Sequence, residues 1–178
     1  MSGVSVWHDP GNVGLLVLRV AVGVVFIAHG YNHIWGGGKI AGTARWFGSL
    51  GMQPGILHAW FASLTELGAG ALLIVGLLTP FAGGGVIGVM VVAWITNHRK
   101  NGFFIFRPGE GYEYVMTLTF CGVLFACIGG GGISLDNAAG IFYPVHWLPA
   151  VLALLAGFGG AIGLLVGFWR PAGVAKKE

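Results

Sequence analysis

The segment NHRKNGFFIFRPGEGYEY, residues 97–114, places charged, aromatic and glycine residues between two long hydrophobic runs. Only 8% of the 178 residues are charged and 56% are hydrophobic, whereas a soluble domain carries roughly 25% charged residues. Several apolar windows reach about 20 residues, the length that a helix needs to cross the hydrocarbon core of a bilayer. The sequence therefore predicts an all-α integral membrane protein in which residues 97–114 form a polar loop at the membrane surface.

Hydrophobic runs separated by turn residues predict five transmembrane helices within a single transmembrane domain that covers residues 1–178. We expect the helices at about 13–35, 57–78, 81–96, 112–128 and 147–169. The connection between the first two, residues 36–54, carries basic and aromatic side chains and is expected to lie in the membrane interface as a short amphipathic helix. Residues 170–178 form a basic tail.

Lysine and arginine are distributed unevenly between the connections. Eight of the nine lie in the segments that follow the first, third and fifth predicted helices. Positively charged loops stay on the cytoplasmic side of a membrane, so we expect a multi-pass protein of the cell (inner) membrane with its N-terminus outside and its C-terminus in the cytoplasm. The net charge of +3 is explained by these loops, so binding to nucleic acid is not expected.

Three ionisable residues fall inside predicted helices: Arg19, His29 and Glu66. Such side chains are costly in lipid, so they face the interior of a bundle and find partners there. The rise of about 1.5 Å per residue puts Glu66 between Arg19 and His29 in depth, within reach of either. One interpretation is a buried ion pair with a hydrogen-bonded histidine. The other is a proton path or head-group pocket in which Glu66 and His29 handle protons.

The histidines suggest a metal site as a further alternative. His29 and His33 are four residues apart and share a helix face, a spacing that can chelate a metal. His98 lies at a depth similar to that of His33, and Glu113 opens the fourth helix. Interfacial histidines that make hydrogen bonds are the commoner case, so no metal site is predicted. A bis-histidine haem is less favoured still, because only His29 lies deep enough.

The polar loop has two interpretations of its own. Asn101-Gly102 is a turn signal, and the loop phenylalanines together with Arg107 suit a position among lipid head groups. Alternatively, the loop closes a site for a quinone ring at the inner leaflet. In that case the candidate cofactor-binding residues are Arg19, His29, Glu66, His98, Asn101, Glu113 and Tyr114.

Several motifs resemble the DoxX family of small membrane proteins, in its actinobacterial type. They are LRVAVGVVFIAHG (18–30), GTARWFGSLGMQP (42–54), ELGAGALLIVGLLT (66–79), NGFF (101–104), GYEY (111–114) and SLD (134–136). The resemblance implies a four-helix core bundle, here about 13–136, and a link to redox chemistry. One branch of the family is similar to a thiosulfate:quinone oxidoreductase subunit, and the actinobacterial branch partners a superoxide dismutase and a sulfurtransferase.

The motif positions carried over from this resemblance are Arg19, His29, Gly30, Glu66, Asn101, Gly102, Glu113 and Tyr114. The chain departs from the family pattern in two places. Pro80 stands where a basic residue often follows the threonine, and the helix at 147–169 is added after the SLD motif. The added helix makes a docking role as plausible as catalysis.

The sequence therefore suggests two functions. The chain is part of an enzyme under the first and is not catalytic under the second. The first is a quinone-interacting oxidoreductase subunit. The alternative is a non-catalytic accessory subunit of a respiratory or export complex, in which Gly157, Gly160 and Gly163 contact another chain. A solute transporter is less favoured because no inverted repeat is evident. The expected surroundings are the lipid bilayer and other membrane-associated redox proteins, because the chain has no nucleotide-binding loop of its own.

Overall fold

The computed structural model of the chain describes residues 6–141 and 147–171, and within them every named element is helical. The long elements are α1 (Pro10–Trp35), α3 (Gly55–Val75), α4 (Thr79–Ala93), α5 (Glu113–Ile128), α7 (Trp147–Leu154) and α8 (Gly160–Phe168). One-turn π-helices extend α4 (η2, Trp94–His98) and join α7 to α8 (η3, Leu155–Gly159). The short elements are η1 (Val6–His8), α2 (Lys39–Ser49) and α6 (Leu135–Ala138).

Four of these helical stretches are long and apolar enough to cross a membrane, and they confirm the predicted membrane fold. They are Pro10–Trp35, Gly55–Val75, Thr79–His98 and Trp147–Phe168. The remaining one, α5, is apolar but has 16 residues. All five agree with the predicted helices to within three residues at each end, and α2 occupies the connection where a short amphipathic helix was expected. The chain is a multi-pass α-helical membrane protein.

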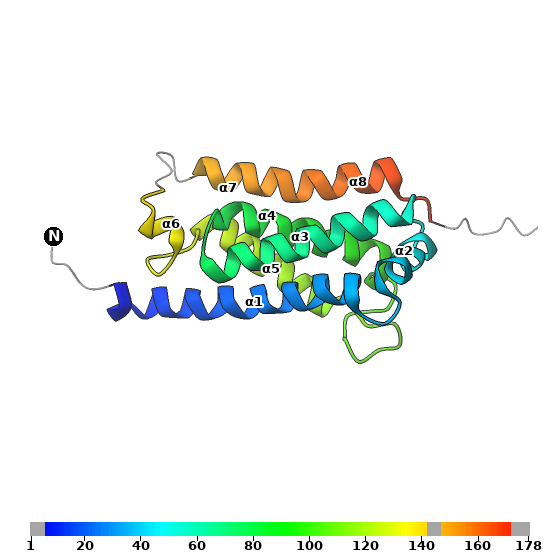
Figure 1. Ribbon diagram of the computed structural model, residues 1–178, viewed down its shortest axis with the longest axis horizontal. Coiled ribbons are helices and arrows are strands. Elements are labelled where there is room, and N and C mark those ends of the chain that lie inside the picture. The colour runs from blue at the N-terminus through cyan, green and yellow to red at the C-terminus, as the bar shows by residue number, and fades with distance from the viewer. Residues whose placement is uncertain (1–5, 142–146, 172–178) are drawn as a thin grey trace, which may run out of the picture.

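The long helices run side by side, with α1 along one side of the bundle and α7–α8 along the other (Figure 1). Close-packed pairs build it: α1 with α3, and α4 with α5. A Cβ atom added at Gly23 would lie 2.7 Å from the carbonyl oxygen of Gly70, and one at Gly83 would lie 2.6 Å from that of Gly122. Small residues at such crossings let membrane helices approach through their backbones, which explains part of the high glycine content.

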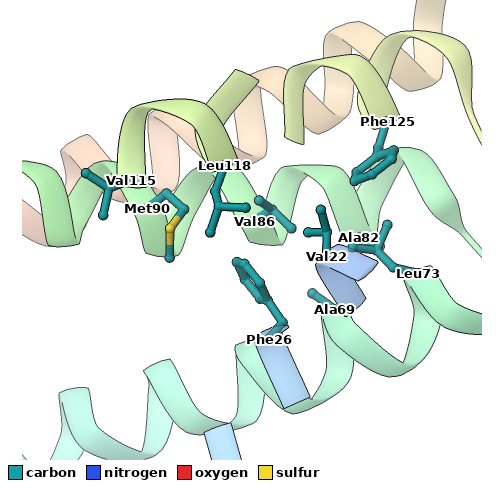
Figure 2. Close-up of a cluster of buried hydrophobic side chains, with 10 residues drawn as sticks. All are labelled: Val22, Phe26, Ala69, Leu73, Ala82, Val86, Met90, Val115, Leu118 and Phe125. Atoms are coloured by element: carbon teal, nitrogen blue, oxygen red, sulfur yellow. The ribbon is translucent and has the colours of Figure 1, made fainter. Parts of the chain in front are cut away.

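Apolar side chains from both pairs meet in a common core. Phe26 of α1, Leu73 of α3, Val86 of α4 and Phe125 of α5 are each at most 1% exposed. Figure 2 shows them pointing toward one another across the space between the helices, together with smaller neighbours. The same cluster continues to Met90 of α4 and Val115 of α5, so the core holds the two pairs together along much of the length of α4 and α5.

The connections that carry lysine and arginine lie at one end of the bundle, with α2 and the 99–112 loop (Figure 1). The end of α8 joins them there: the backbone amide of Arg170 donates to the carbonyl oxygen of Gly51 at 2.7 Å. The guanidinium of Arg99 lies 5.4 Å from the ring centre of Trp169. This clustering agrees with the sequence, in which lysine and arginine occur in every second connection between helices. Lys176 and Lys177 of the predicted tail lie outside the described residues.

At the opposite end, the turn from α3 into α4 is held by α6. Asp136 accepts hydrogen bonds from the backbone amides of Leu78 and Thr79, at 2.7 and 3.0 Å, and from the Thr79 hydroxyl at 2.8 Å. A carboxylate at this place satisfies the free amides at the start of α4 and suits the positive end of its dipole. Asp136 thus acts as a cap supplied from a distant part of the chain.

Candidate functional site

A pocket of about 610 Å³ lies between the helix pairs, and its lining runs along α4 from Phe81 to His98 of η2, at the cationic end. Helices α1, α3, α4, α5 and α8 all contribute to its wall, and α2 covers one side. Of the residues that the sequence suggested for a site, it brings together His29, Glu66, His98 and Tyr114.

Of the two acidic residues that line this pocket, Glu66 is the buried one, with its side chain 5% exposed. Its Oε2 atom lies 3.0 Å from Nδ1 of His33, a residue that the sequence had offered only as a metal ligand. The two atoms are close enough for an ion pair, but they are not aligned for a hydrogen bond and neither has another hydrogen-bond partner. Both therefore keep bonding capacity inside a largely apolar pocket.

His29 and Tyr114 form the part of the wall beside this pair. Their ring centres are 6.4 Å apart, with the rings tilted by 31°. His29 is exposed at the surface of α1, whereas Tyr114 is half-buried and lies near enough to Glu66 for their charges to interact. Acid, imidazole and phenol thus come from three different helices to one side of the pocket.

His98 is buried at the end of η2 and is already committed to local hydrogen bonds. Its Nδ1 lies 2.9 Å from the carbonyl oxygen of Glu110, and its Nε2 lies 3.3 Å from Nδ2 of Asn97. A neutral ring that donates from Nδ1 and accepts at Nε2 satisfies both contacts. His98 therefore ties the loop to the end of α4. Across residues 6–141 and 147–171, no three His, Cys, Asp or Glu side chains group closely enough to hold a metal ion.

Asn101 and Glu113 stabilise the loop and do not line the pocket. The side-chain amide of Asn101 donates to the carbonyl oxygens of Asn97, Gly109 and Glu110. The Oε1 atom of Glu113 accepts from the backbone amide of Ile105 at 2.8 Å. The loop phenylalanines point outward, and Phe106 is 79% exposed. The hydrogen bonds of Asn101 and Glu113 hold the loop in this shape.

Arg19 is placed far from the pocket, which corrects the expectation that it lies within reach of Glu66. Its guanidinium donates to the carbonyl oxygens of Leu73, at 2.6 Å, and Ile133. Leu73 follows Glu66 by seven residues, about 10 Å along α3. The Leu73 carbonyl, in the last turn of α3, also accepts the backbone amide of Gly76 at 3.3 Å, so the guanidinium is a second donor to it and is held at the depth of that turn. The negative charge that attracts the guanidinium of Arg19 is the carboxylate of Asp136.

His58 is a further pocket residue that the sequence interpretation did not include. It is 2% exposed, its Nε2 lies 3.3 Å from the carbonyl oxygen of Gln53, and its Nδ1 has no hydrogen-bond partner. A signal was available, because His58 precedes Glu66 by eight residues and so lies near it around the helix axis.

The amino-acid sequence is similar to those of known proteins. A family model described as DoxX matches residues 14–99, which include Arg19, His33, Glu66 and His98. The chain is also similar to a protein of Bacillus subtilis (strain 168) that bears the name "Putative oxidoreductase CatD": 31% identical over 124 residues, covering 70% of this chain and 85% of the relative. No solved structure matches the chain. The chain belongs to the DoxX family.

Proposed function

We propose that this DoxX protein works in membrane redox chemistry by binding a quinone-type ring in the pocket, with Glu66 and His33 exchanging protons with it. The observation that carries the proposal is the buried pair itself: an acid and an imidazole 3.0 Å apart, with no hydrogen-bond partner for the two facing atoms, in a largely apolar pocket. Ionisable groups at membrane depth mark proton or ligand sites more often than they serve packing. The oxidoreductase name of the Bacillus subtilis relative supports the same class of chemistry.

The pocket suits such a ring in size and in character. Its volume of about 610 Å³ lies within the roughly 300–1,000 Å³ of typical ligand sites, which combine apolar walls with a few converging polar groups. Met90 and Val89 of α4 supply apolar surface beside Glu66, and the ring of Tyr114 closes one side. The unpartnered Nδ1 of His33 and Oε2 of Glu66 are the groups that face a ring oxygen.

The roles of the residues follow from their positions. A bound quinone supplies two-electron, two-proton chemistry at its ring oxygens. Glu66 holds a proton away from water, because its side chain is 5% exposed, and His33, at 17%, connects it with the surface of α1. The two electrons that a quinol gives up on oxidation pass to a partner redox protein, which we place at the cationic end of the bundle. Tyr114 and His29 position the ring beside the acid.

We further propose that the cationic end faces the cytoplasm of a cell membrane, with the N-terminus outside. Lys39, Arg99, Lys100 and Arg170 all lie near that end, and positively charged loops are retained on the cytoplasmic side. A fluorescent-protein fusion after residue 178 should therefore fluoresce, and an alkaline phosphatase fusion at the same place should be inactive. The reverse pattern would contradict this orientation, and fusions within residues 129–134 provide the matched control with opposite expected signals.

The binding site is tested directly by a photoreactive quinone. After illumination of the purified protein in lipid nanodiscs, we expect the label on peptides that contain His33, Glu66 or Tyr114, and we expect excess unlabelled quinone to reduce it severalfold. Peptides from the exposed faces of α7 and α8 supply the internal control, because non-specific labelling from lipid is not competed. Labelling confined to those faces, or unaffected by competitor, would refute the quinone site.

A second candidate is a non-catalytic accessory subunit of a larger membrane complex. One observation favours it: Gly160 and Gly163 of α8 are exposed, and a Cβ atom at either would meet no atom within 4 Å, so another helix can approach there. Gly157, expected on the same surface, packs instead against Gly84 within the chain, where its added Cβ would lie 2.7 Å from the Gly84 carbonyl oxygen. Failure of the photolabelling experiment would favour this candidate.

A further inference from the structure

We infer that the ligand of this pocket carries a long isoprenoid or alkyl tail, and that the tail lies in a groove between α3, α4 and α8. This inference rests on the proposed quinone site and names the class of ligand that the site takes: a membrane-borne quinone in place of a small soluble ring. We call this part of the pocket the tail groove; its residues are Phe61 and Thr65 of α3, Phe81, Gly85 and Gly88 of α4, and Gly160 of α8.

The tail groove is continuous with the site around Glu66, because the same pocket is lined by both sets of residues. The two parts lie on different sides of the seam between α3 and α4. Glu66 faces His33 of α1, whereas the carbonyl oxygen of Gly157, in the α7–α8 helix, is the neighbour of Gly88. None of the six tail-groove residues is ionisable; beyond them, the buried His58 of α3 also lies toward α8, with its ring centre 5.3 Å from that of Phe168.

Close packing accounts for Gly85, where an added Cβ atom would lie 3.2 Å from Cβ of Ala69, but not for Gly88 or Gly160. At Gly84 an added Cβ atom would lie 2.8 Å from the Ala153 carbonyl oxygen, so a larger residue there would force the helices apart. At Gly88 the nearest atom would be 3.6 Å away, an ordinary contact, and at Gly160 no atom lies within 4 Å. Side chains at Gly88 and Gly160 would project into the pocket without displacing a helix. Their absence keeps the groove open.

The groove also reaches the lipid-facing surface. Phe61 and Phe81 are 50% and 41% exposed, and both stand on helices long and apolar enough to cross the membrane. The hydrocarbon core of a bilayer lies against such a surface, so a ligand enters sideways from the lipid. An apolar tail suits this route, because it leaves acyl chains for an apolar groove and desolvates no polar group.

One ligand accounts for both parts of the pocket. A ring beside Glu66 needs the converging polar groups of the α1 side, and a tail attached to the ring must leave through the apolar groove because the pocket is continuous. A phospholipid acyl chain in the groove would fill the same space without depending on the ring site. The two occupants can be distinguished by measurement. Only if the tail is joined to the ring does a substitution in the groove weaken binding of the quinone.

The test compares two ligands with the same ring, menadione without a tail and a menaquinone with a short isoprenoid tail. Binding is followed by quenching of tryptophan fluorescence in nanodiscs of fixed lipid content; Trp46 lines the pocket and reports on it. In Gly88→Leu we expect menaquinone binding to weaken about tenfold, the loss typical of forcing extra methylene groups into a filled space, while menadione binding stays unchanged. Gly68→Leu, on an exposed face of α3 with no atom within 4 Å, is the matched control.

The outcomes separate the two proposals. If Gly88→Leu binds both ligands as the unchanged chain does, the tail groove is refuted and the quinone site stands; the same result is expected if a phospholipid chain fills the groove. If Gly88→Leu loses both ligands, the division into ring site and groove is refuted. If the unchanged chain binds neither ligand, the proposed function fails as well. Should Gly88→Leu not fold, Gly160→Leu tests the groove from its opposite wall.

Discussion

Replacing Arg19 with methionine is expected to lower the free energy of unfolding by about 3–5 kcal/mol, the range found when one partner of a buried charged cluster is removed. The guanidinium is fully buried and donates to the carbonyl oxygens of Leu73 and Ile133. Methionine keeps the apolar length of the side chain and removes its donors. The carbonyls and the buried Asp136 would then lose their compensating positive charge.

The measurement is unfolding of the purified protein in mixed micelles with increasing denaturing detergent. Arg45→Met is the matched control, because Arg45 is exposed on α2 and such surface changes stay within about 0.5 kcal/mol. Equal stability of Arg19→Met and Arg45→Met would show that the arginine is not part of the structural core of this end.

The membrane fold was predictable from sequence because the determining quantity is local. A helix that crosses a bilayer needs a continuous apolar run of fixed length, and residues 10–35, 55–75 and 147–168 supply it without reference to other parts of the chain. The arrangement of cationic loops at one end followed in the same way from the alternation of helices. Helix α2 was predictable from the mixture of basic and aromatic residues between two such runs.

Which polar side chains meet one another inside the bundle was not predictable in the same way. The depth count placed Glu66 between Arg19 and His29, whereas the structure sets it level with Gly30 of α1, and such a count says nothing about the rotation of each helix. In the structure Gly30 brings α1 against α3, where its added Cβ would lie 3.1 Å from Cβ of Glu66. His33 is three residues further on the same face, so it reaches the acid. The Gly30–His33 spacing was the signal in the sequence.

The loop residues show a second limit. Asn101 and Glu113 belong to polar motifs, and polar motifs beside a membrane suggest ligand binding as readily as loop structure. Their hydrogen bonds to Gly109 and Ile105 depend on how the loop folds back on itself, which no local pattern specifies. The sequence therefore located a segment that borders the pocket, but not which of its residues line it.

Replacing Glu66 with glutamine is expected to lower quinone-linked turnover by about 10²–10⁴-fold, the usual contribution of a positioned general acid or base. Glutamine has nearly the shape of glutamate, so the packing against Gly30 and His33 is retained. It cannot take up or release a proton near neutral pH. Oxidation of a quinol requires that two protons leave the ring oxygens as two electrons pass to an acceptor, so removing the proton acceptor slows the reaction.

Turnover is measured as quinol-dependent reduction of a dye that accepts the electrons in place of the partner protein, with protein-free nanodiscs as the blank. Glu110→Gln is the matched control, because Glu110 also borders the pocket but is exposed, and its contact with His98 uses the backbone carbonyl. Unfolding curves and photolabelling should be the same for both variants. Turnover of Glu66→Gln equal to that of Glu110→Gln would exclude Glu66 from proton transfer.

Glu66 and His33 together give a more specific prediction than either residue alone. If His33 passes protons between Glu66 and the surface, His33→Gln should lose turnover to a similar extent, and the double variant should lose no more than Glu66→Gln does. Groups that act as a unit behave in this non-additive way, because the second removal interrupts a path that is already broken. Losses that multiply would mean that His33 acts on the ring independently, and the proton would then have to leave Glu66 by another route, past Tyr114 or His29.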